Sequence, residues 1–390
     1  MKDQIQTIMA RFLRHALKIL SVGKQHKKRV VFFSYFGSQY SCNPKYICEY
    51  LLEHEPEYEI VWAFENPEKF RHLEEKGIRT TRYLSLAFLR ICLTSRYLIT
   101  NSEIPAWFPI TKKQILINTW HGGGAYKKVG AAYEKETAGK QKRAEIARKN
   151  PCIYLSSSEA FTQMTLRESF QHQGEVLAYG MPRNDMLVKQ NRNDLYQKIR
   201  EYYQIPAGNH ILLYAPTYRN SKKADEYLFD CAKVKAALTS RFGGEWSILF
   251  RMHYFVMEQL SDSAEYIDAS AYPDMQELLY ASDILITDYS SSMWDFALKK
   301  APCFLFATDL DHYDLSRGFY TDIHTWPFPL AQNTEQLLTK IRIFDEEAYL
   351  KNVNRHLDEL GCQETGESAA KVCAYLKAAT HKSVSINKLK

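Results

Sequence analysis

Three consecutive serines at residues 290–292 follow a short apolar run and offer hydroxyl donors to an anion. The apolar run at residues 284–286 has the pattern of a strand buried on both faces of a parallel sheet. Asp288 or Ser290 is placed to cap a helix that continues through residues 294–298. A helix start after a strand exposes N–H groups and the positive end of the helix dipole, which favours a phosphate. The alternative is a serine-rich cap that binds no ligand.

A histidine stands between a predicted strand and three glycines. The strand is predicted at residues 115–118, His121 follows it, and residues 122–124 are all glycine. Glycines let a backbone approach a ligand, and an imidazole titrates near neutral pH, so His121 is a candidate for acid–base chemistry. The same HGGG string occurs in the oxyanion loop of lipase-like hydrolases, but the sequence lacks the G-x-S-x-G elbow that those enzymes need. A structural histidine is the alternative.

Lys127 and Lys128 begin a basic stretch that reaches Lys149 and holds eight Lys or Arg residues against three Glu. Together with Gly122 and Gly123, these two lysines are candidates for binding an acceptor or a phosphate. For most of the stretch, a solvated helix face is an equally good interpretation.

Further polar clusters lie where other predicted strands end. The clusters are Thr217 with Arg219, Arg251 with His253, and Arg317 with the three residues after it. Arg219 could clamp a phosphate through two hydrogen bonds. His253 should open toward the same side of the sheet as Ser290, because the carboxyl ends of parallel strands meet at one edge. Each cluster alone could be structural, but their corresponding positions favour a binding site.

Metal binding has weak support. Asp309 and Asp311 form a D-x-D pattern, which binds a metal in some nucleotide-sugar enzymes, but three-residue patterns recur by chance. The eight cysteines lie far apart, without a C-x-x-C pair or zinc spacing, and favour reduced thiols in a cytosolic protein. We therefore predict no required metal and no cofactor.

The composition bounds the class of protein. At 390 residues, two domains of ordinary size are expected, and an apolar content of 45% is enough for two cores. No apolar run approaches the ~20 residues of a membrane span. The N-terminal segment also lacks the continuous apolar region of a signal peptide.

Predicted strands alternate with helical stretches, which indicates parallel βαβ units. The strands are predicted at residues 30–34, 60–64, 97–100, 115–118, 150–157, 175–180, 211–215, 246–251, 284–287 and 302–307. The pattern restarts after a polar helical segment at residues 185–204. We predict an α/β protein with two Rossmann-like domains, at residues 30–200 and 201–390, that face each other across a ligand-binding cleft.

Residues 1–29 form a separate basic segment, with eight basic residues against one acidic residue. A helix here would gather one apolar arc and place Arg11, Arg14 and Lys18 opposite it. The apolar arc consists of Ile5, Ile8, Met9, Phe12, Leu13, Ala16, Leu17, Ile19 and Leu20. Such a helix can lie in an anionic membrane surface. The alternative is a helix that packs its apolar arc on the protein's own core.

Taken together, these segments resemble the CDP-glycerol glycerophosphotransferase family of teichoic acid synthesis. The matching segments, in chain order, lie at residues 33–34, 43–45, 120–122, 127–130, 215–219, 251–253, 274–278, 282–291, 295–296 and 317–320. They cover the chain from about residue 30 to 325. The departure is at residues 123–126, Gly-Gly-Ala-Tyr, where many relatives have Thr-Pro-Leu after the first glycine.

The resemblance implies a GT-B architecture and a reaction. A polyol phosphate would move from a CDP-linked donor to a hydroxyl of a polyprenyl-diphosphate-linked acceptor, and CMP would be released. Such an enzyme would work as a peripheral protein on the cytoplasmic face of the cell membrane, held there by the N-terminal helix, and would bind no nucleic acid.

The site residues acquire roles in that reaction. The attacking hydroxyl needs a base, for which His121 is the candidate, while His253 would stabilise the phosphoryl group as it gathers charge. The residues expected to bind the donor are Thr217, Arg219, Arg251, Ser290, Ser291, Asp295 and Arg317. Within this set, Asp295 is one helical turn past Ser291 and could reach the ribose hydroxyls.

Two other classes stay open. One is a different enzyme of the same architecture, such as a ribitol phosphotransferase, a sugar-nucleotide glycosyltransferase or a non-hydrolysing epimerase. The other is a non-catalytic protein whose basic segments bind nucleic acid or membranes, which a salt-dependent DNA affinity without CMP release would reveal.

Overall fold

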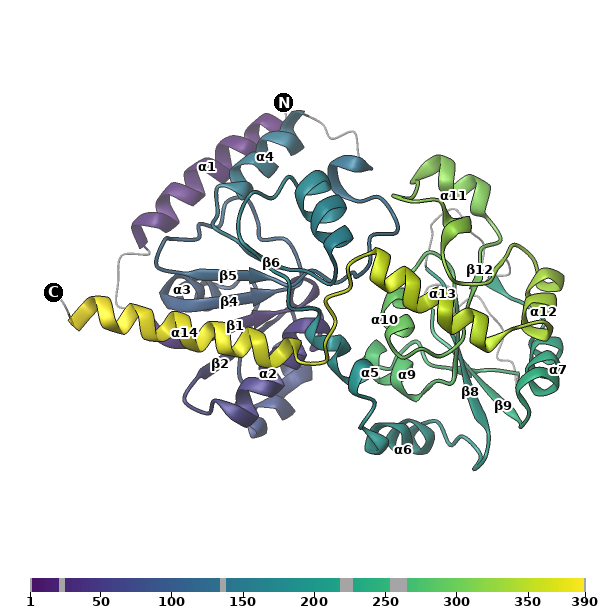
Figure 1. The fold of residues 1–390 in the computed structure, drawn as a ribbon. Coiled ribbons are helices and arrows are strands. Elements are labelled where there is room, and N and C mark those ends of the chain that lie inside the picture. Colours follow the sequence, from purple (N-terminus) through teal and green to yellow (C-terminus); the bar gives the residue numbers. More distant parts are fainter. Residues whose placement is uncertain (1, 21–24, 134–137, 218–226, 253–264, 389–390) are drawn as a thin grey trace. The chain divides into compact units, whose positions relative to one another are not determined.

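The computed structural model describes residues 2–20, 25–133, 138–217, 227–252 and 265–388. Two compact units emerge, each built around its own sheet (Figure 1). The first unit comprises Met1–His121, Val129–Asp185 and Gln363–Lys390, and the second comprises Gly122–Lys128 and Met186–Cys362. The chain thus enters the second unit for seven residues after His121 and returns to the first unit at Gln363. The predicted domain bounds of 30–200 and 201–390 included neither of these features.

The first unit holds a seven-stranded sheet in the order β3-β2-β1-β4-β5-β6-β7, and every neighbouring pair is parallel. Its strands are β1 (His26–Phe33), β2 (Glu59–Phe64), β3 (Arg79–Arg82), β4 (Ser95–Thr100), β5 (Ile115–Asn118), β6 (Ile153–Leu155) and β7 (Val176–Leu177). The strand order reverses between β1 and β4, and in such sheets ligands bind beyond the carboxyl ends at the reversal.

Helices cover both faces of this sheet. The helices of the first unit are α1 (Lys2–Leu20), α2 (Cys42–His54), α3 (Leu86–Thr94), α4 (Ala138–Arg148) and α14 (Ser368–Lys388). Helix α5 (Asp185–Lys189) begins at the last residue of a first-unit segment and continues in the second unit. Helices α2 and α14 lie side by side on one face (Figure 1), where Phe32 and Trp62 meet Leu376 in a buried core. On the other face, alternate residues such as Phe33 pack with α3 and with Leu17 of α1. The expected doubly wound α/β architecture is confirmed.

Helix α1 packs on the rest of the first unit through a different face from the predicted one. Arg14, expected opposite the apolar arc among solvated basic residues, is only 8% exposed. Its guanidinium donates to the Phe108 carbonyl at 3.0 Å and to Asn150 Oδ1 at 2.6 Å. Leu17, expected on the apolar arc, is buried. A helical wheel sorts residues by polarity, whereas this helix docks through an arginine long enough to reach backbone carbonyls of the loop beneath it.

Most of the remaining side chains of the apolar arc of α1 are exposed. Six of its side chains are between 40% and 72% exposed, namely Ile5, Ile8, Met9, Phe12, Leu13 and Ile19. We call this set the α1 apolar face. Helix α1 lies beside α4 (Figure 1). In the described part of the chain, no helix is both long and apolar enough to cross a membrane.

Three of the basic residues of the N-terminal segment belong to the sheet. Strand β1 begins at His26, earlier than expected, and includes Lys27, Lys28 and Arg29. Arg29 is buried and pairs with Glu59 at 2.8 Å. This ion pair with β2 offsets part of the positive charge that residues 1–29 were expected to present to a membrane.

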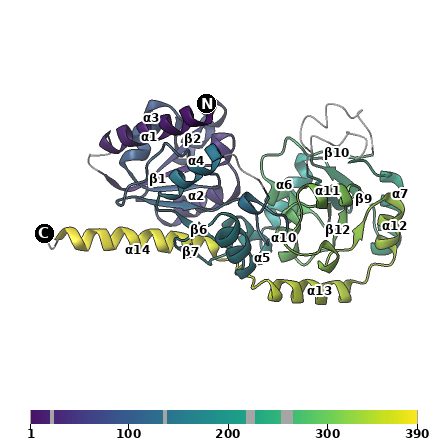
Figure 2. The ribbon, with the colours of Figure 1, turned by 90° about the horizontal axis from the view of Figure 1, so that it is seen from above.

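The second unit repeats the plan with a six-stranded parallel sheet in the order β10-β9-β8-β11-β12-β13. Its strands are β8 (His210–Tyr214), β9 (Trp246–Phe250), β10 (Ile267–Asp268), β11 (Ile284–Thr287), β12 (Cys303–Phe306) and β13 (Leu330–Ala331). Its helices are α6 (Asn193–Tyr202), α7 (Cys231–Phe242), α9 (Met275–Ala281), α10 (Ser292–Leu298), α11 (Leu310–Ser316), α12 (Thr334–Arg342) and α13 (Glu346–Glu359). Helices α7 and α12 lie side by side in both views (Figures 1 and 2). The strand order reverses between β8 and β11.

The docking of α1 gives a stability prediction. Arg14→Leu removes charge-assisted hydrogen bonds to buried acceptors and should lower the free energy of unfolding by about 2–3 kcal/mol. The matched variant Arg11→Leu changes an exposed residue of the same helix and should stay within about 0.5 kcal/mol of the parent chain. Urea denaturation followed by circular dichroism measures both. Equal stabilities of the two variants would show that Arg14 does not anchor the helix.

Candidate active site

His121 lies at the carboxyl edge of the first sheet, just beyond β5, and is partly buried. Its Nδ1 atom is 2.9 Å from the backbone carbonyl oxygen of Asn101, which follows β4. A carbonyl oxygen only accepts, so Nδ1 carries the proton and the lone pair of the neutral ring is on Nε2. The ring stacks on Trp120 with centroids 4.2 Å apart and meets the ring of Tyr35 at 5.5 Å. His121 is therefore held in a defined tautomer and orientation.

The glycines after His121 belong to the second unit and pack against a tryptophan. A Cβ atom on Gly123 would stand 2.4 Å from Cδ1 of Trp294, a fully buried residue of α10. Gly124 has φ +73°, and a Cβ atom added there would stand 2.4 Å from Cε2 of the Tyr126 ring. Close packing thus accounts for both glycines. The roles of Gly122 and Gly123 at a phosphate or acceptor stay predictions.

The two lysines of this segment pair with the cluster that follows α11. Lys127 forms an antiparallel bridge with Phe319, and the Lys128 N–H donates to the Gly318 carbonyl at 3.1 Å. The guanidinium of Arg317 donates to the Lys128 carbonyl at 3.2 Å. The structure therefore joins two clusters that were separate candidates in the sequence, although it assigns no ligand to them.

A contact between Tyr126 and His356 also holds the segment at residues 122–128 within the second unit. The hydroxyl of Tyr126 lies 3.0 Å from Nε2 of His356 on α13, and the two rings stack at 5.8 Å. Burial, followed by the nearby charge of Arg355, lowers the pKa of His356 to about 4. His356 is therefore neutral at physiological pH and can accept the tyrosine proton in a hydrogen bond.

The strand reversal of the second sheet brings together the ends of β8 and β11. The buried carboxylate of Asp288 accepts the Thr217 N–H at 2.9 Å and the Tyr289 N–H at 2.6 Å. The expectation that Asp288 caps the following helix is wrong, because its carboxylate instead ties the two strand ends together. Thr217 Oγ1 is buried and has no hydrogen-bond partner among the described residues. That hydroxyl lies where a parallel sheet binds its ligand.

The serines expected at the phosphate lie at the start of α10. Ser290 Oγ accepts the Ser292 N–H at 3.3 Å, and Ser291 occupies the N-cap position without a side-chain capping bond. Both side chains are half-buried. The predicted order of strand, polar turn and helix is confirmed, while phosphate binding by these serines stays a prediction.

Two other donor-site candidates make internal bonds. Arg251 donates to the Tyr272 carbonyl at 2.6 Å and so holds the loop after β10. Asp295 is 4% exposed, and its carboxylate accepts the side-chain amide of Gln276 at 2.8 Å. These contacts orient both side chains, and their contact with a nucleotide remains predicted.

Two predicted residues, Arg219 and His253, lie outside the described residues. Asp309 of the D-x-D pattern accepts the Tyr289 hydroxyl at 3.2 Å. Across the described part of the chain, no group of three or more His, Cys, Asp or Glu side chains is arranged to hold a metal ion.

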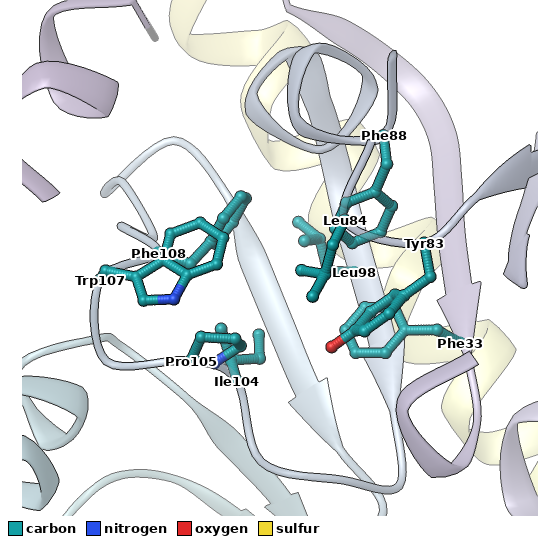
Figure 3. A pocket seen from close by; sticks show the side chains of 9 residues that line it. All are labelled: Phe33, Tyr83, Leu84, Phe88, Leu98, Ile104, Pro105, Trp107 and Phe108. Atoms are coloured by element: carbon teal, nitrogen blue, oxygen red, sulfur yellow. The ribbon is translucent and has the colours of Figure 1, made fainter. Parts of the chain in front are cut away.

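A small apolar pocket lies in the first unit (Figure 3). Figure 3 shows Trp107 and Phe108 on one side, facing Tyr83 and Phe33 on the other. The remaining lining residues are Leu84, Phe88, Leu98, Ile104 and Pro105. Nucleotide sites need a few placed polar groups, so this apolar lining does not suit the CDP portion of a donor.

Two parallel Rossmann-like sheets, one in each unit, together with the similarity to solved structures given below, define a GT-B architecture. The family model described as CDP-glycerol:poly(glycerophosphate) glycerophosphotransferase matches residues 16–377. The chain belongs to this family, and it is an enzyme of the CDP-glycerol phosphotransferase class.

Relatives and solved structures agree with this assignment. The chain is 32% identical over 380 residues to a teichoic acid poly(glycerol phosphate) polymerase of Bacillus spizizenii, covering 94% of this chain and 96% of that one. It is 34% identical over 360 residues to the polymerase of the same name from Bacillus subtilis, covering 89% of this chain and 48% of that one. A variant of the wall teichoic acid polymerase TagF, with a histidine replaced by asparagine and soaked with CDPG, aligns with a TM-score of 0.83 at 26% identity over 98% of each chain.

Other similarities bear on the polyol. The chain is 25% identical over 400 residues to a teichoic acid ribitol-phosphate primase of Bacillus spizizenii, covering 97% of this chain and 98% of that one. A TagF variant with a histidine replaced by alanine aligns with a TM-score of 0.80 at 26% identity over 98% of each chain.

Proposed function

We propose that this enzyme transfers glycerol phosphate from CDP-glycerol to a hydroxyl of a lipid-linked teichoic-acid or related cell-surface acceptor. The acceptor oxygen attacks the β-phosphorus of CDP-glycerol, and the bond from this phosphorus to the bridging oxygen breaks. The hydroxyl proton passes to a base, and CMP leaves with the bridging oxygen. The family supports the donor, while the lipid-linked acceptor and the release of CMP are our proposal.

The observation that carries the proposal is the hydrogen bond from Nδ1 of His121 to the Asn101 carbonyl. It leaves Nε2 as the basic nitrogen, and an imidazole suits a base near neutral pH. Two of the similar TagF structures are variants in which one histidine is replaced, and one of these variants was soaked with CDPG. We therefore assign the general base to His121.

We place the donor at the strand reversal of the second unit. The buried Thr217 hydroxyl, Ser290 and Ser291 lie at the ends of β8 and β11, where sheets of this order bind nucleotides. The other residues proposed to contact the donor are Arg219, Arg251, His253, Asp295 and Arg317. Gly122, Gly123, Lys127 and Lys128 belong with this unit, and we assign the two lysines to phosphate charge on the donor.

Ribitol phosphate is the second candidate for the transferred group. The similarity to a ribitol-phosphate primase over nearly the whole of both chains favours keeping it. The glycerol-phosphate polymerase of Bacillus spizizenii, at 32% identity, favours glycerol.

We further propose that the enzyme binds the cytoplasmic face of the cell membrane through the α1 apolar face. The helix is anchored to the first unit by Arg14, so these apolar side chains are presented on a fixed support. Arg11 and His15 are exposed on the same helix beside this face. An apolar face bordered by basic residues suits an anionic lipid surface.

The role of His121 gives a kinetic prediction. His121→Ala should lower kcat by roughly 10²–10⁴-fold with the Kd of CDP-glycerol little changed, because a base acts in the transition state. The readout is CMP release in single-turnover reactions, with donor binding measured by calorimetry. His54→Ala is the matched control, since His54 also stacks on an aromatic ring and bonds a carbonyl but lies at the end of α2. Near-parent turnover by the His121 variant would rule out the base.

The membrane proposal is tested with point substitutions, because deleting residues 1–29 would remove the start of β1. The double variant Ile8→Ser and Phe12→Ser should weaken binding to anionic vesicles roughly 10- to 100-fold through lost apolar burial. It should retain the parent stability, since both side chains are exposed. The control is Leu315→Ser with Ile343→Ser, which changes two exposed apolar residues of the second unit. Equal vesicle binding by both double variants contradicts the proposal.

A further inference from the structure

Three buried asparagines surround the backbone that carries His121. Asn43, Asn101 and Asn118 are each at most 3% exposed. They come from three places, the start of α2, the end of β4 and the last residue of β5. Burying an amide is costly unless it is hydrogen-bonded, so the bonds of these side chains show what they hold.

Two of the asparagines hold the main chain just before His121. Asn118 Oδ1 accepts the Trp120 N–H at 2.9 Å, and its Nδ2 donates to the Ser102 carbonyl at 3.1 Å. Asn43 Nδ2 lies 3.3 Å from the Thr119 carbonyl and 3.2 Å from the Trp120 carbonyl. These bonds fix Trp120 in a left-handed conformation, φ +52°, which a bulky residue rarely adopts.

Asn101 holds the other side of the ring. Its Oδ1 accepts the Tyr35 N–H at 2.8 Å and the Ser102 hydroxyl at 3.0 Å, while its backbone carbonyl accepts from His121. Tyr35 is also left-handed, φ +46°, and its ring meets His121. One residue thus sets both the proton position on His121 and the backbone of an aromatic neighbour.

The cost of this arrangement is visible in the amide. Asn101 Nδ2 is buried and has no hydrogen-bond partner among the described residues. Rotating the amide would turn its NH₂ group toward the Tyr35 N–H, so the bond from this N–H to Oδ1 fixes the orientation. An unpaired buried N–H costs roughly 1–3 kcal/mol. Retaining it beside two strained residues is typical of a site where geometry matters more than stability.

We propose that Asn101 is a positioning residue for the base. Its backbone carbonyl keeps the proton of neutral His121 on Nδ1, and its side chain holds Tyr35 against the ring. Nε2 is then left to accept the proton of the attacking hydroxyl. The inference rests on the proposed role of His121.

The titratable surroundings of His121 bear on any pH test. Tyr35 is in ring contact with it, and Tyr154 lies one step further out, 3.5 Å from Asn118 Nδ2. Burial, then the charges of Cys152 and Glu103, raises the pKa of Tyr154 well above its ordinary value. Tyr154 is therefore neutral across the pH range in which an imidazole titrates.

Two substitutions separate the parts played by the amide. Asn101→Asp keeps an oxygen for the Tyr35 N–H and the Ser102 hydroxyl but adds a negative charge near His121. That charge favours the imidazolium, so the acid limb of the kcat/KM profile should move to higher pH, with kcat on the alkaline plateau within roughly fivefold of the parent. Asn101→Leu removes the side-chain oxygen that accepts from the Tyr35 N–H and the Ser102 hydroxyl, while the backbone carbonyl remains. It should lower kcat about 10²-fold, the usual cost of a misplaced catalytic group, with the Kd of CDP-glycerol unchanged.

The matched control is Asn150→Leu. Asn150 is a buried asparagine of the same unit that accepts the Ile110 N–H and the Arg14 guanidinium. Its replacement should lower stability and leave the pH profile in place. An unshifted acid limb in Asn101→Asp, or parent kcat in a folded Asn101→Leu, overturns the positioning role.

A spectroscopic measurement keeps this inference separate from the proposed function. Nitrogen NMR of the ¹⁵N-histidine-labelled full chain, with His121→Gln to assign the signal, reports which ring nitrogen carries the proton. We expect the Nδ1–H tautomer at alkaline pH, whether or not the protein transfers glycerol phosphate. An Nε2–H tautomer overturns the inference, whereas the expected tautomer without any transfer would count against the proposed function alone.

Discussion

The parallel alignment of strands is the constraint on which the rest of this structure depends. In each unit every neighbouring strand runs in the same direction, so all the carboxyl ends meet at one edge. In the first unit this edge collects Tyr35, Asn101 and His121, and in the second it collects Thr217 and Asp288. The order and common direction of the strands are therefore enough to make residues that are distant in sequence neighbours in space.

The chain passes from the first unit to the second directly after His121. His121 is the last residue of its segment of the first unit, and Gly122 begins the seven residues that belong to the second. Those residues are held by Trp294, by the strand pairing with Phe319 and by the Tyr126–His356 contact. The glycines are therefore explained by packing in the second unit, and the histidine by the hydrogen bonds of the first.

The strands could be predicted because most are short apolar runs that end in polar residues, as at residues 284–286. Strand β3 was missed because its sequence, Arg-Thr-Thr-Arg, is polar and lies at the sheet edge. Arg14 was misplaced because polarity on a helical wheel does not show a buried arginine that reaches carbonyls. Asn101 carried a signal, a polar residue directly after a buried strand, but its partner in Tyr35 depends on strand order. No local pattern could place residues 122–128 in the second unit, since that depends on contacts with residues almost two hundred positions away.

A comparison of two donors distinguishes glycerol phosphate from ribitol phosphate as the transferred group. The full chain is incubated in separate reactions with CDP-glycerol and CDP-ribitol, each with a prenyl-diphosphate-linked acceptor, and both CMP and the acceptor mass are followed. We expect CMP formation with CDP-glycerol, matched by acceptor molecules heavier by glycerol phosphate, at a higher kcat/KM than with CDP-ribitol. Transfer that prefers CDP-ribitol, or CMP that appears without any gain in acceptor mass, would contradict it.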